Sequence, residues 1–567
     1  MPQPAESPIA ELTPEDGHSV HPGPHSFEKQ ITVEAWFHCD DNRAECMQSL
    51  VSKWRPRDSL EKDCFAGYDA GQTDGLDTRG YYGAVFDGRY VYFAQELQPQ
   101  GQHGNALRFD THGDFNDPAR YEAFDASNID GLETIGYYGA VFDGRFVYYV
   151  PRKTSMADSN LLRFDTHGDF KDADSWSAYS FESLQTFQNA AFDGQYIYLC
   201  PGYRERDDDD DGRSGRVVRY NTHGDFKSQS SYEVFDAESV DGLNVGNFDG
   251  GAFDGRFIYL VPLTNSVALR YDTQADYHDQ AGWQAFDASA LGMGMCVGSV
   301  FDGRYLYWVP YENGIQIRFD TQGDFRDPES WSRFDASNTN GLYTVGFDGG
   351  MFDGRFIHFI PFVSENKTFH SNWLRYDSQK EFDDPSAWHG QDVASIDGLK
   401  TQGYNGGAFD GRYLYCAPWR SEFGDRINRE TWEIHGRVLR YDSLGTDGTF
   451  SLRYCDYGHN GGLTAATPGP TFLVNTDRGA LSISVHRMPP PGRHHLAGVY
   501  DGNCLKLYLD GNLAAERSGL GTLQANDVPI IAGQINGGLG QFRGSIERIR
   551  VFNAVRSEEE IRLDAGS

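Results

Sequence analysis

The sequence has 567 residues and a formal net charge of −34 at pH 7. Such an acidic surface repels phosphate backbones and anionic lipid, so nucleic acid and membrane surfaces are excluded as expected partners. No apolar run approaches the length that spans a bilayer. The chain is long enough for two hydrophobic cores. Its aromatic content of 14% suits tightly packed sheets and would also supply surfaces for stacking against sugars.

The N-terminal residues 1–26 are polar, acidic and rich in Pro, and they lack the apolar stretch of a signal peptide. We therefore expect a disordered tail and a cytoplasmic protein, or a secreted one if the sequence has been trimmed. Segment 27–57 follows, with runs of β-forming residues at 31–37 and 49–54. Cys39 and Cys46 flank a polar loop there and would form a disulfide only in an oxidising compartment, which the sequence leaves open.

One motif recurs seven times in the next part of the chain. It reads Phe-Asp-Gly-Arg-aromatic, followed by alternating apolar and aromatic residues and usually by Pro, with Gln195 in place of Arg in the third copy. The copies lie roughly 54 residues apart on average, the size of a propeller blade or a solenoid unit. They centre on Asp87, Asp143, Asp193, Asp254, Asp302, Asp353 and Asp410. Residues present in every copy are expected to serve the fold.

Each copy predicts four antiparallel strands. The copy that begins at Gly136 divides into β-forming segments at 136–142, 145–150, 161–165 and 175–181. Asp143-Gly144 between the first two is a tight hairpin turn, and Pro151 ends the second strand because it cannot donate to a ladder. Four-stranded repeats without helical periodicity are typical of β-propeller blades, whereas the units of a parallel β-helix are much shorter.

The ring of blades is predicted to close through the N-terminal segment. No fourth strand follows the seventh copy, but residues 64–76 parallel 331–342, which include the fourth strand of the fifth copy. We therefore expect 58–445 to form a seven-bladed propeller in which the N-terminal segment supplies the outer strand of the last blade. This arrangement leaves no free edge strand.

A ring of variable residues is the best candidate for a functional site. Four positions before each motif Phe, the side chain varies and is mostly polar. Its neighbours are aromatic on one side, with Cys296 the exception, and Gly or Asn on the other, as if packed between blades. A polar side chain facing another blade would need partners, but one facing a water-filled channel would not. We therefore expect this ring to line the channel mouth. Its members are Tyr82, Tyr138, Gln188, Asp249, Val297, Asp348 and Asn405.

Two carboxylates, two phenols and two amides in this ring would suit sugar hydroxyls or a cation, and a water-filled channel without a ligand is the alternative. Asp249 and Asp348 are the candidate catalytic acid–base pair, with Tyr82 and Tyr138 as further catalytic candidates.

The loops that follow the second strands add three more candidates. Arg152 is a candidate ligand-binding residue, and Trp419 would stack on a pyranose ring if its indole face is exposed. Asp207, Asp209 and Asp211 match the start of an Asp-x-Asp-x-Asp-Gly calcium loop, but the distal acidic ligand is out of register and a solvated acidic loop is the alternative. Ca²⁺ is the one cofactor that the sequence suggests.

The C-terminal segment 446–567 has strand patterns at 494–501, 505–511 and 544–552, followed by the helical tail Ser557-Glu-Glu-Glu-Ile561. Together with 31–37 and 49–54 it resembles the laminin-G-like, concanavalin A-type jelly rolls, which habitually end in this way. The resemblance implies a single jelly roll, built from 27–57 and 446–567, into which the propeller is inserted. It also implies a family rich in glycan and calcium-dependent recognition, but the binding loops of that family vary and no ligand residue can be carried over.

The sequence thus favours an all-β, ligand-binding protein that recognises carbohydrate or another polyhydroxylated ligand at the channel mouth, on the jelly roll, or at both. One alternative is an enzyme at the same face, acting on a polysaccharide as lyase or hydrolase or on a small natural product. Another is a scaffold for a protein partner. We find no Walker loop, dinucleotide fingerprint, HExxH, clustered CxxC or nucleophile elbow, so no motif decides between them.

Overall fold

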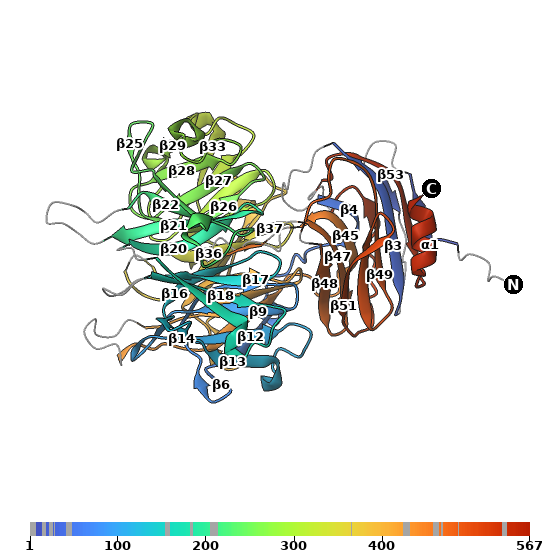
Figure 1. Ribbon diagram of the computed structural model, residues 1–567, viewed down its shortest axis with the longest axis horizontal. Coiled ribbons are helices and arrows are strands. Elements are labelled where there is room, and N and C mark those ends of the chain that lie inside the picture. Colours follow the sequence, from blue (N-terminus) through green and yellow to red (C-terminus); the bar gives the residue numbers. More distant parts are fainter. Residues whose placement is uncertain are drawn as a thin grey trace.

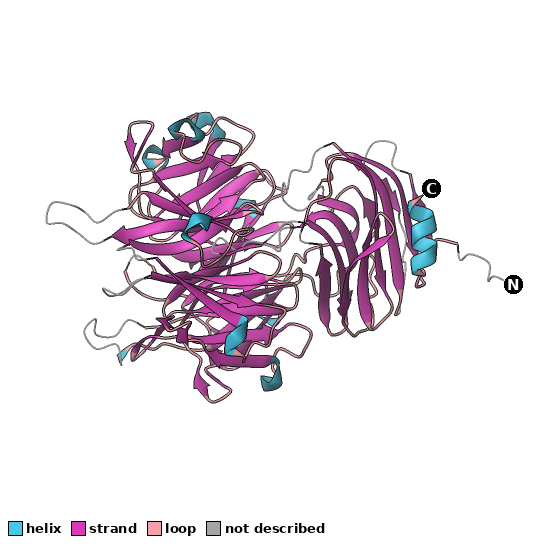
Figure 2. Ribbon diagram, in the orientation of Figure 1, coloured by secondary structure: helices cyan, strands magenta, loops and turns pink. Residues whose placement is uncertain are grey.

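The computed structural model places two β-rich bodies side by side (Figure 1), and nearly all of their regular structure is strand (Figure 2). It describes residues 7–13, 19–21, 27, 29–40, 48–152, 159–181, 185–204, 214–364, 366–422, 431–456, 464–466, 469–485, 487–535 and 541–566.

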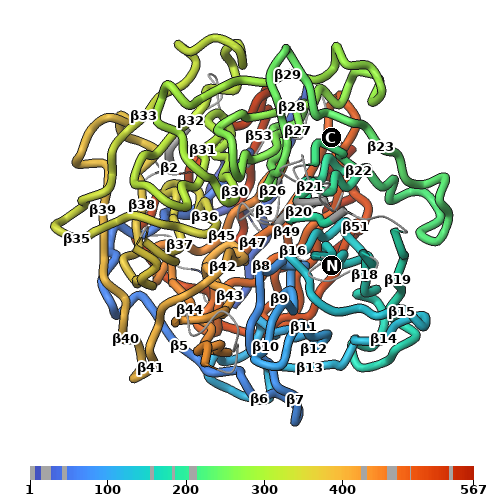
Figure 3. The backbone as a smooth tube through the Cα atoms, turned by 90° about the vertical axis from the view of Figure 1, so that its left-hand side faces the viewer, coloured from blue at the N-terminus to red at the C-terminus, as the bar shows by residue number. Residues whose placement is uncertain are grey.

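The larger body is a ring of seven four-stranded antiparallel sheets, as the sequence predicts (Figure 3). The first strand of each blade lies innermost and contacts the first strands of the neighbouring blades. From the inside outward, the strands of blades 1 to 3 are β8 (Tyr81–Phe86), β9 (Tyr90–Gln95), β12 (Asn105–Asp110) and β13 (Tyr121–Asp125); β16 (Tyr137–Phe142), β17 (Phe146–Pro151), β18 (Ser159–Asp165) and β19 (Trp176–Phe181); and β20 (Gln185–Phe192), β21 (Tyr196–Arg204), β22 (Arg216–Asn221) and β23 (Tyr232–Asp236).

Blades 4 to 7 repeat this order. Their strands are β26 (Phe248–Phe253), β27 (Phe257–Pro262), β28 (Val267–Asp272) and β29 (Trp283–Asp287); β30 (Cys296–Phe301), β31 (Tyr305–Pro310), β32 (Ile315–Asp320) and β33 (Trp331–Asp335); β36 (Phe347–Phe352), β37 (Phe356–Pro361), β38 (Asn372–Asp377) and β39 (Trp388–Asp392); and β42 (Tyr404–Phe409), β43 (Tyr413–Pro418), β44 (Arg437–Asp442) and β5 (Phe65–Asp69).

Short elements connect the strands. Two-stranded arms extend outward in the pairs β6 (Gln72–Thr73) with β7 (Leu76–Asp77), β10 (Leu97–Gln98) with β11 (Gly101–Gln102), β14 (Asn128–Ile129) with β15 (Leu132–Glu133), β24 (Ser239–Val240) with β25 (Leu243–Asn244), β34 (Asn338–Thr339) with β35 (Leu342–Tyr343), and β40 (Ser395–Ile396) with β41 (Leu399–Lys400). Single 3₁₀ turns lie at Lys62–Cys64, Pro118–Arg120, Ala173–Ser175, Gln229–Ser231, Gln280–Gly282, Ser289–Leu291, Pro328–Ser330 and Pro385–Ala387.

The predicted closure of the ring is confirmed. β5 pairs with β44 in antiparallel register, so that Phe65 lies opposite Tyr441. The Phe65 ring also packs against Trp373 in the neighbouring blade, at 5.3 Å between ring centroids. The N-terminal segment therefore completes blade 7 and holds it against blade 6.

The repeated Asp of the Phe-Asp-Gly motif stabilises its own hairpin. In blade 4, Asp254 Oδ1 accepts hydrogen bonds from the backbone N–H groups of Arg256 and Phe257, at 2.8 and 2.7 Å, and Oδ2 accepts from the Tyr259 hydroxyl at 2.7 Å. Arg256 pairs with Asp272 on the third strand at 2.6 Å. The hydrogen bonds of the turn Asp recur around the ring, with His358 in place of Tyr in blade 6, whereas Gln195 replaces the paired Arg in blade 3. These residues serve the fold, as their repetition indicates.

The smaller body is a jelly roll of two packed six-stranded sheets. Blue N-terminal strands lie among red C-terminal strands in Figure 1, because each sheet draws on both ends of the chain. In spatial order, the sheets are β1 (Ala10–Leu12), β53 (Ser545–Phe552), β3 (Ile31–Cys39), β49 (Gly492–Tyr500), β50 (Cys504–Leu509) and β51 (Asn512–Ser518); and β2 (Ser19–His21), β52 (Ile530–Ala532), β4 (Gln48–Trp54), β45 (Gly448–Asp456), β47 (Gly469–Thr476) and β48 (Gly479–Ser484).

Helix α1 (Glu558–Ala565) forms the expected tail, with a capping box between Ser557 and Glu560. No helix in the described part of the chain is long and apolar enough to cross a membrane.

The prediction of a disordered tail over 1–26 is wrong for the described residues of β1 and β2. Both strands pair at the edges of the jelly-roll sheets. The alternation of apolar and polar residues at 10–12, which buries Ala10 and Leu12, is too short to be recognised as a strand in sequence. Cys39 is a free, buried thiol whose Sγ lies 3.4 Å from the carbonyl oxygen of Pro490, and Cys46 lies outside the described residues.

The two bodies meet at the hairpin turns of the propeller. The carbonyl oxygen of Gly88 accepts a hydrogen bond from Arg517 of the jelly roll, and Arg412 Nη1 donates to Asn475 Oδ1 at 2.7 Å. Between β45 and β47, the chain leaves the jelly roll, and β46 (Thr464–Ala466) pairs in parallel with β16, the innermost strand of blade 2. Because β46 also contacts β8 and β20, it lies within the channel of the ring. The sequence did not predict this element.

Candidate functional site

A bulge at the start of each inner strand turns the variable position toward the axis. In blade 1, Tyr81 pairs with Gln95 and Ala84 with Phe93, so the register shifts between them. Such a bulge needs a residue with positive φ, which Gly adopts without steric cost. The small position therefore serves the backbone conformation as well as close packing: a Cβ on Gly139 of blade 2 would lie 2.4 Å from Asn189 Oδ1 of blade 3. The φ values at the small position are 79° at Gly83, 87° at Gly139, 69° at Asn189, 84° at Gly250, 79° at Gly298, 75° at Gly349 and 62° at Gly406.

The predicted ring residues converge on the propeller axis. The Tyr82 hydroxyl of blade 1 donates to Asp348 Oδ2 of blade 6 at 3.0 Å, and its ring stacks on Tyr138 of blade 2. Gln188 Nε2 donates to Asp249 Oδ2 at 3.1 Å. The amide of Asn405, oriented to satisfy its neighbours, donates to Asp348 Oδ2 at 3.1 Å. We call these residues, together with Val297, the axial cluster.

The axial cluster is buried, which corrects the expectation of a wet channel mouth. Its members are between 0% and 6% exposed. A second tier covers them on the face away from the jelly roll, and it consists of the residue that follows each second strand or its terminal Pro: Glu96, Arg152, Gly202, Leu263, Tyr311, Phe362 and Trp419.

Polar contacts join this second tier to itself and to the axial cluster. Glu96 Oε1 accepts from Arg152 Nη1 at 3.1 Å, and Glu96 Oε2 accepts from Trp419 Nε1 at 2.7 Å. The Arg152 guanidinium lies 4.5 Å from the centre of the Tyr138 ring. Trp419 is not an exposed stacking platform, because it is 6% exposed and the Arg420 guanidinium covers its ring at 3.7 Å.

Glu96 is a site residue that our sequence reasoning missed. It follows Gln95, which takes the place of the usual Pro, and so occupies the position of Arg152 in the next blade. Alignment of the residues after each Pro would have revealed it.

Burial shifts the acid–base behaviour of the axial carboxyl groups. It raises the pKa of Asp249 to about 8, although Arg152 and the Gln188 amide act in the opposite direction. Burial, and then the charge of Asp249, raise the pKa of Asp348 well above its usual range. Burial also lowers the pKa of the Arg420 guanidinium to about 10. Both carboxyl groups are therefore held toward their protonated form at neutral pH.

Three oxygens in the axial cluster have no hydrogen-bond partner among the described residues: Asp249 Oδ1, Asp348 Oδ1 and Gln188 Oε1. Buried polar atoms are normally satisfied, and an unsatisfied one costs about 1–3 kcal/mol. The arrangement therefore offers an amide acceptor and two carboxyl groups, which donate when protonated and accept when ionised, to a group that brings hydroxyls to the axis.

The calcium expectation receives no support from the described residues. They contain no group of three or more His, Cys, Asp or Glu side chains arranged to hold a metal ion. The proposed calcium ligands Asp207, Asp209 and Asp211 lie outside the described residues.

Comparisons with known proteins bear on the two bodies separately. Residues 436–562 match the family model of the concanavalin A-like lectin/glucanases superfamily, Laminin_G_3. The match omits β1 to β4, which the inserted propeller separates from the remaining strands. No curated protein matches the sequence.

Among solved structures, the β-propeller domain of Myceliophteria thermophila Swd1 is 10% identical with a TM-score of 0.40, covering 65% of this chain and 97% of that one. The periplasmic gluconolactonase PpgL of Pseudomonas aeruginosa is 14% identical with a TM-score of 0.37, covering 66% and 98%.

The sheet order and the family match together define the class of this protein. The protein consists of a seven-bladed β-propeller inserted into a discontinuous, laminin-G-like jelly roll of the concanavalin A type.

Proposed function

We propose that this protein binds a small polyhydroxylated ligand, a carbohydrate in the first instance, at the axial cluster. The observation that carries the proposal is the convergence of three unpartnered oxygens, Asp249 Oδ1, Asp348 Oδ1 and Gln188 Oε1. Sugar hydroxyls would donate to the Gln188 oxygen, and they would accept from a protonated carboxyl group or donate to an ionised one. The hydroxyls would also accept from the amides and phenols of the same ring, which match the mixed polar lining of small-molecule sites.

Entry to the axial cluster would pass Arg152. Its side chain is 32% exposed, whereas that of its partner Glu96 is 3% exposed. Displacing Arg152 would break one ion pair and uncover the Tyr138 ring, and a pyranose face could then take the place of the guanidinium. In this arrangement Arg152 and Tyr138 are ligand-binding residues, as the sequence suggests. Trp419 contributes by holding Glu96.

A glycan array tests this proposal, run with the wild type and with Asp348→Asn, once with calcium and once with EDTA. The wild type should bind specific glycans, and Asp348→Asn should lose at least about tenfold in affinity, because Oδ1, an oxygen that can accept in either protonation state, becomes an NH₂ group that only donates. Asp335→Asn is the matched control, since it makes the same chemical substitution at an exposed strand end. A blank array, or equal binding by the wild type and Asp348→Asn, would contradict the proposal. Loss of binding in EDTA would add a metal to it.

A second candidate function is acid–base catalysis on the same ligand. It is favoured by the raised pKa of Asp249, about 8, next to Asp348, whose pKa is also raised by burial and by the charge of Asp249. Carboxyl groups of this kind act as general acids near neutral pH. If the protein is an enzyme, Asp249→Asn should no longer convert a glycan identified on the array, even at glycan concentrations that saturate the variant. If neither protein converts the bound glycan, this candidate is excluded for that ligand.

A further inference from the structure

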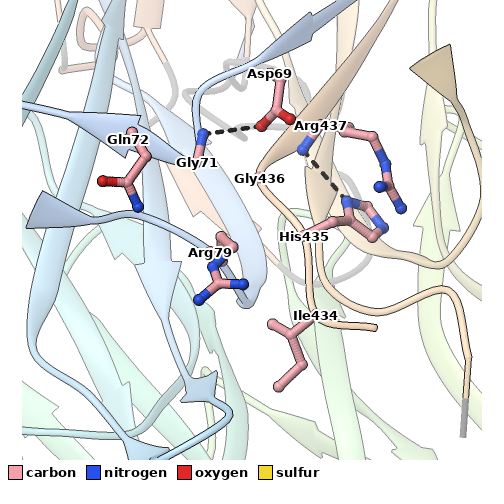
Figure 4. A pocket seen from close by; sticks show the side chains of 8 residues that line it. All are labelled: Asp69, Gly71, Gln72, Arg79, Ile434, His435, Gly436 and Arg437. Atoms are coloured by element: carbon pink, nitrogen blue, oxygen red, sulfur yellow. Dashed lines mark hydrogen bonds between the residues drawn. The ribbon is translucent and has the colours of Figure 1, made fainter. Parts of the chain in front are cut away.

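A cavity lies at the seam where the N-terminal segment closes the ring (Figure 4). Its volume is about 610 Å³, within the range of about 300–1,000 Å³ that is usual for small-molecule sites. One wall comes from the segment between β5 and β8 and the other from the start of β44, more than 350 positions later in the sequence. The lining residues are Asp69, Gly71, Gln72, Arg79, Ile434, His435, Gly436 and Arg437.

We call this cavity the seam pocket, and it lies where two Gly residues meet at a blade junction. At other blade junctions a Gly backbone lies close to a residue that carries a side chain. A Cβ on Gly104 would lie 2.4 Å from Ser127 Cα, and one on Gly314 would lie 2.5 Å from Ser337 Cα. At the seam, a Cβ on Gly436 would lie 2.4 Å from Gly71 Cα, so the partner residue is itself a Gly. The side chains of Asp69 and Arg79 border this space, because a Cβ on Gly71 would lie 3.0 Å from Asp69 Oδ1 and 3.2 Å from Arg79 Cγ.

Two guanidinium groups line the pocket, and that of Arg79 has an unused donor. Arg79 takes the place of Ile135 in the next repeat. Its Nε and Nη2 donate to Asp77, at 2.7 and 2.6 Å, and its Nη1 has no partner in the described chain. Arg437 takes the place of Asn105, and its Nη1 and Nη2 donate to Glu433 and Ser421, at 3.1 and 3.0 Å, while its Nε is buried and unpartnered.

Acceptors and an apolar surface complete the seam pocket. Asp69 is exposed and its Oδ1 accepts from the backbone N–H of Gly71 at 3.0 Å, which leaves Oδ2 available. The exposed Gln72 adds an amide, and Ile434 adds an apolar side chain. Asp77 and Glu433 offset the two guanidinium charges, so the site offers donors without a net positive charge. A neutral ligand with many hydroxyls matches this set better than an anion does.

We infer that the seam pocket binds a neutral saccharide unit, independently of the axial cluster. The walls come from the N-terminal segment and from blade 7, so a bound saccharide would join the two parts that close the ring. Binding to the closed ring alone would stabilise it, because a ligand that prefers the folded state shifts the unfolding equilibrium.

The test uses saturation-transfer NMR and thermal unfolding of the full chain with maltotriose, cellotriose and diacetylchitobiose, and with trigalacturonic acid as the anionic probe. Gly71→Ser adds a side chain at the seam, at the position that Ser127 occupies at the next junction. Ala394→Ser is the matched control, because Ala394 occupies the equivalent position at another junction and its N–H also donates to an Asp, Asp392 Oδ1, at 3.0 Å. Gln72→Ala is a second variant, at an exposed position where misfolding is not expected.

We expect at least one neutral saccharide to bind the wild type with a Kd near the millimolar range and to raise its Tm. The same saccharide should bind at least about tenfold more weakly to Gly71→Ser, and it should also bind more weakly to Gln72→Ala. Ala394→Ser and Asp348→Asn should bind the saccharide like the wild type. Unchanged binding by Asp348→Asn would show that the seam pocket acts independently of the axial cluster. The inference is overturned if none of the three neutral saccharides binds, if only trigalacturonic acid binds, or if both Gly71→Ser and Gln72→Ala bind like the wild type.

Discussion

Asp254 and Asp249 lie five positions apart in blade 4, and both carboxyl groups are buried, but their surroundings differ. Asp254, in the turn that faces the jelly roll, accepts from two backbone N–H groups and one hydroxyl. Asp249, at the opposite end of the same strand, accepts one hydrogen bond, from Gln188, and its other oxygen has no described donor. The difference separates a carboxyl group that holds a hairpin from one that remains available to a ligand.

The same difference runs around the whole ring. The turn aspartates are identical in all seven repeats and are satisfied within their own blade. The axial residues differ from blade to blade and find partners across the axis, such as Tyr82 with Asp348. Repetition therefore marks residues of the fold, and departure from repetition marks the candidate sites, both at the axis and at the seam.

The largest effect is expected from removing a turn carboxyl group. Asp254→Ala eliminates three hydrogen bonds and should lower the free energy of unfolding by about 3 kcal/mol, at about 1 kcal/mol each. Asp249→Ala eliminates one hydrogen bond and also a buried acid, so its cost should be about 1 kcal/mol or less. Chemical unfolding of both variants measures the difference. Equal losses in the free energy of unfolding would contradict the distinction between the turn aspartates and the axial cluster.

The pH dependence of stability sharpens the comparison. The folded pKa of Asp249 is about 8 against a usual 3.8, so the folded state holds its proton between these values while the unfolded state releases it. Stability from this group should therefore fall as pH rises from about 4 to about 8, by at most about 1.4 kcal/mol per unit. The wild type should lose Tm relative to Asp249→Asn across this window. Parallel Tm profiles would show that Asp249 titrates normally.

Tyrosine hydroxyls provide a matched pair of smaller changes. Tyr82→Phe removes a donor to Asp348 and Tyr259→Phe removes one to Asp254, each at about 1 kcal/mol of stability. Only Tyr82→Phe should also weaken the binding of a glycan identified on the array, because only Tyr82 borders the unpartnered oxygens. Weaker glycan binding by a well-folded Tyr259→Phe variant would place the ligand elsewhere.

The smallest effect is expected at the repeated Arg. Arg145→Gln copies the natural Gln195 of blade 3 and removes a pair with Asp165 in which the Arg side chain is 56% exposed, so the loss should be about 0.5 kcal/mol or less. Arg412→Gln should cost more, because this side chain is 11% exposed and also donates to Asn475 of the jelly roll. Thermal unfolding compares the two, and a larger loss for Arg145→Gln would contradict the interdomain role of Arg412.

The sequence predicted the architecture well, because each blade repeats its own turn and strand signals. The Asp-Gly turns, the terminal Pro residues and the similarity of 64–76 to 331–342 located the blades and the closing strand. The predicted boundaries of the propeller, at residues 58 and 445, stay a prediction. Short edge strands such as Ala10–Leu12 escaped because three residues carry too little pattern, and β46 escaped because its pairing partner is more than 300 residues away.

The candidate site was predicted by position but not by environment. The repeat alignment identified the ring of Tyr82, Asp249 and Asp348, but burial depends on side chains such as Leu263 and Phe362 that cover it from separate blades. Trp419 was expected to be exposed, whereas neighbouring side chains cover its indole. The seam pocket depends on two Gly residues in different segments, and no local pattern brings those together.

The most direct test of the central claim is a crystal structure of the protein with a glycan identified on the array. The account predicts ligand hydroxyls within hydrogen-bond distance of Asp249 Oδ1 and Asp348 Oδ1, with Arg152 moved from the Tyr138 ring. A glycan bound only at other positions, with ordered water on these two oxygens, would contradict it and would make the axial cluster a hydrated part of the fold.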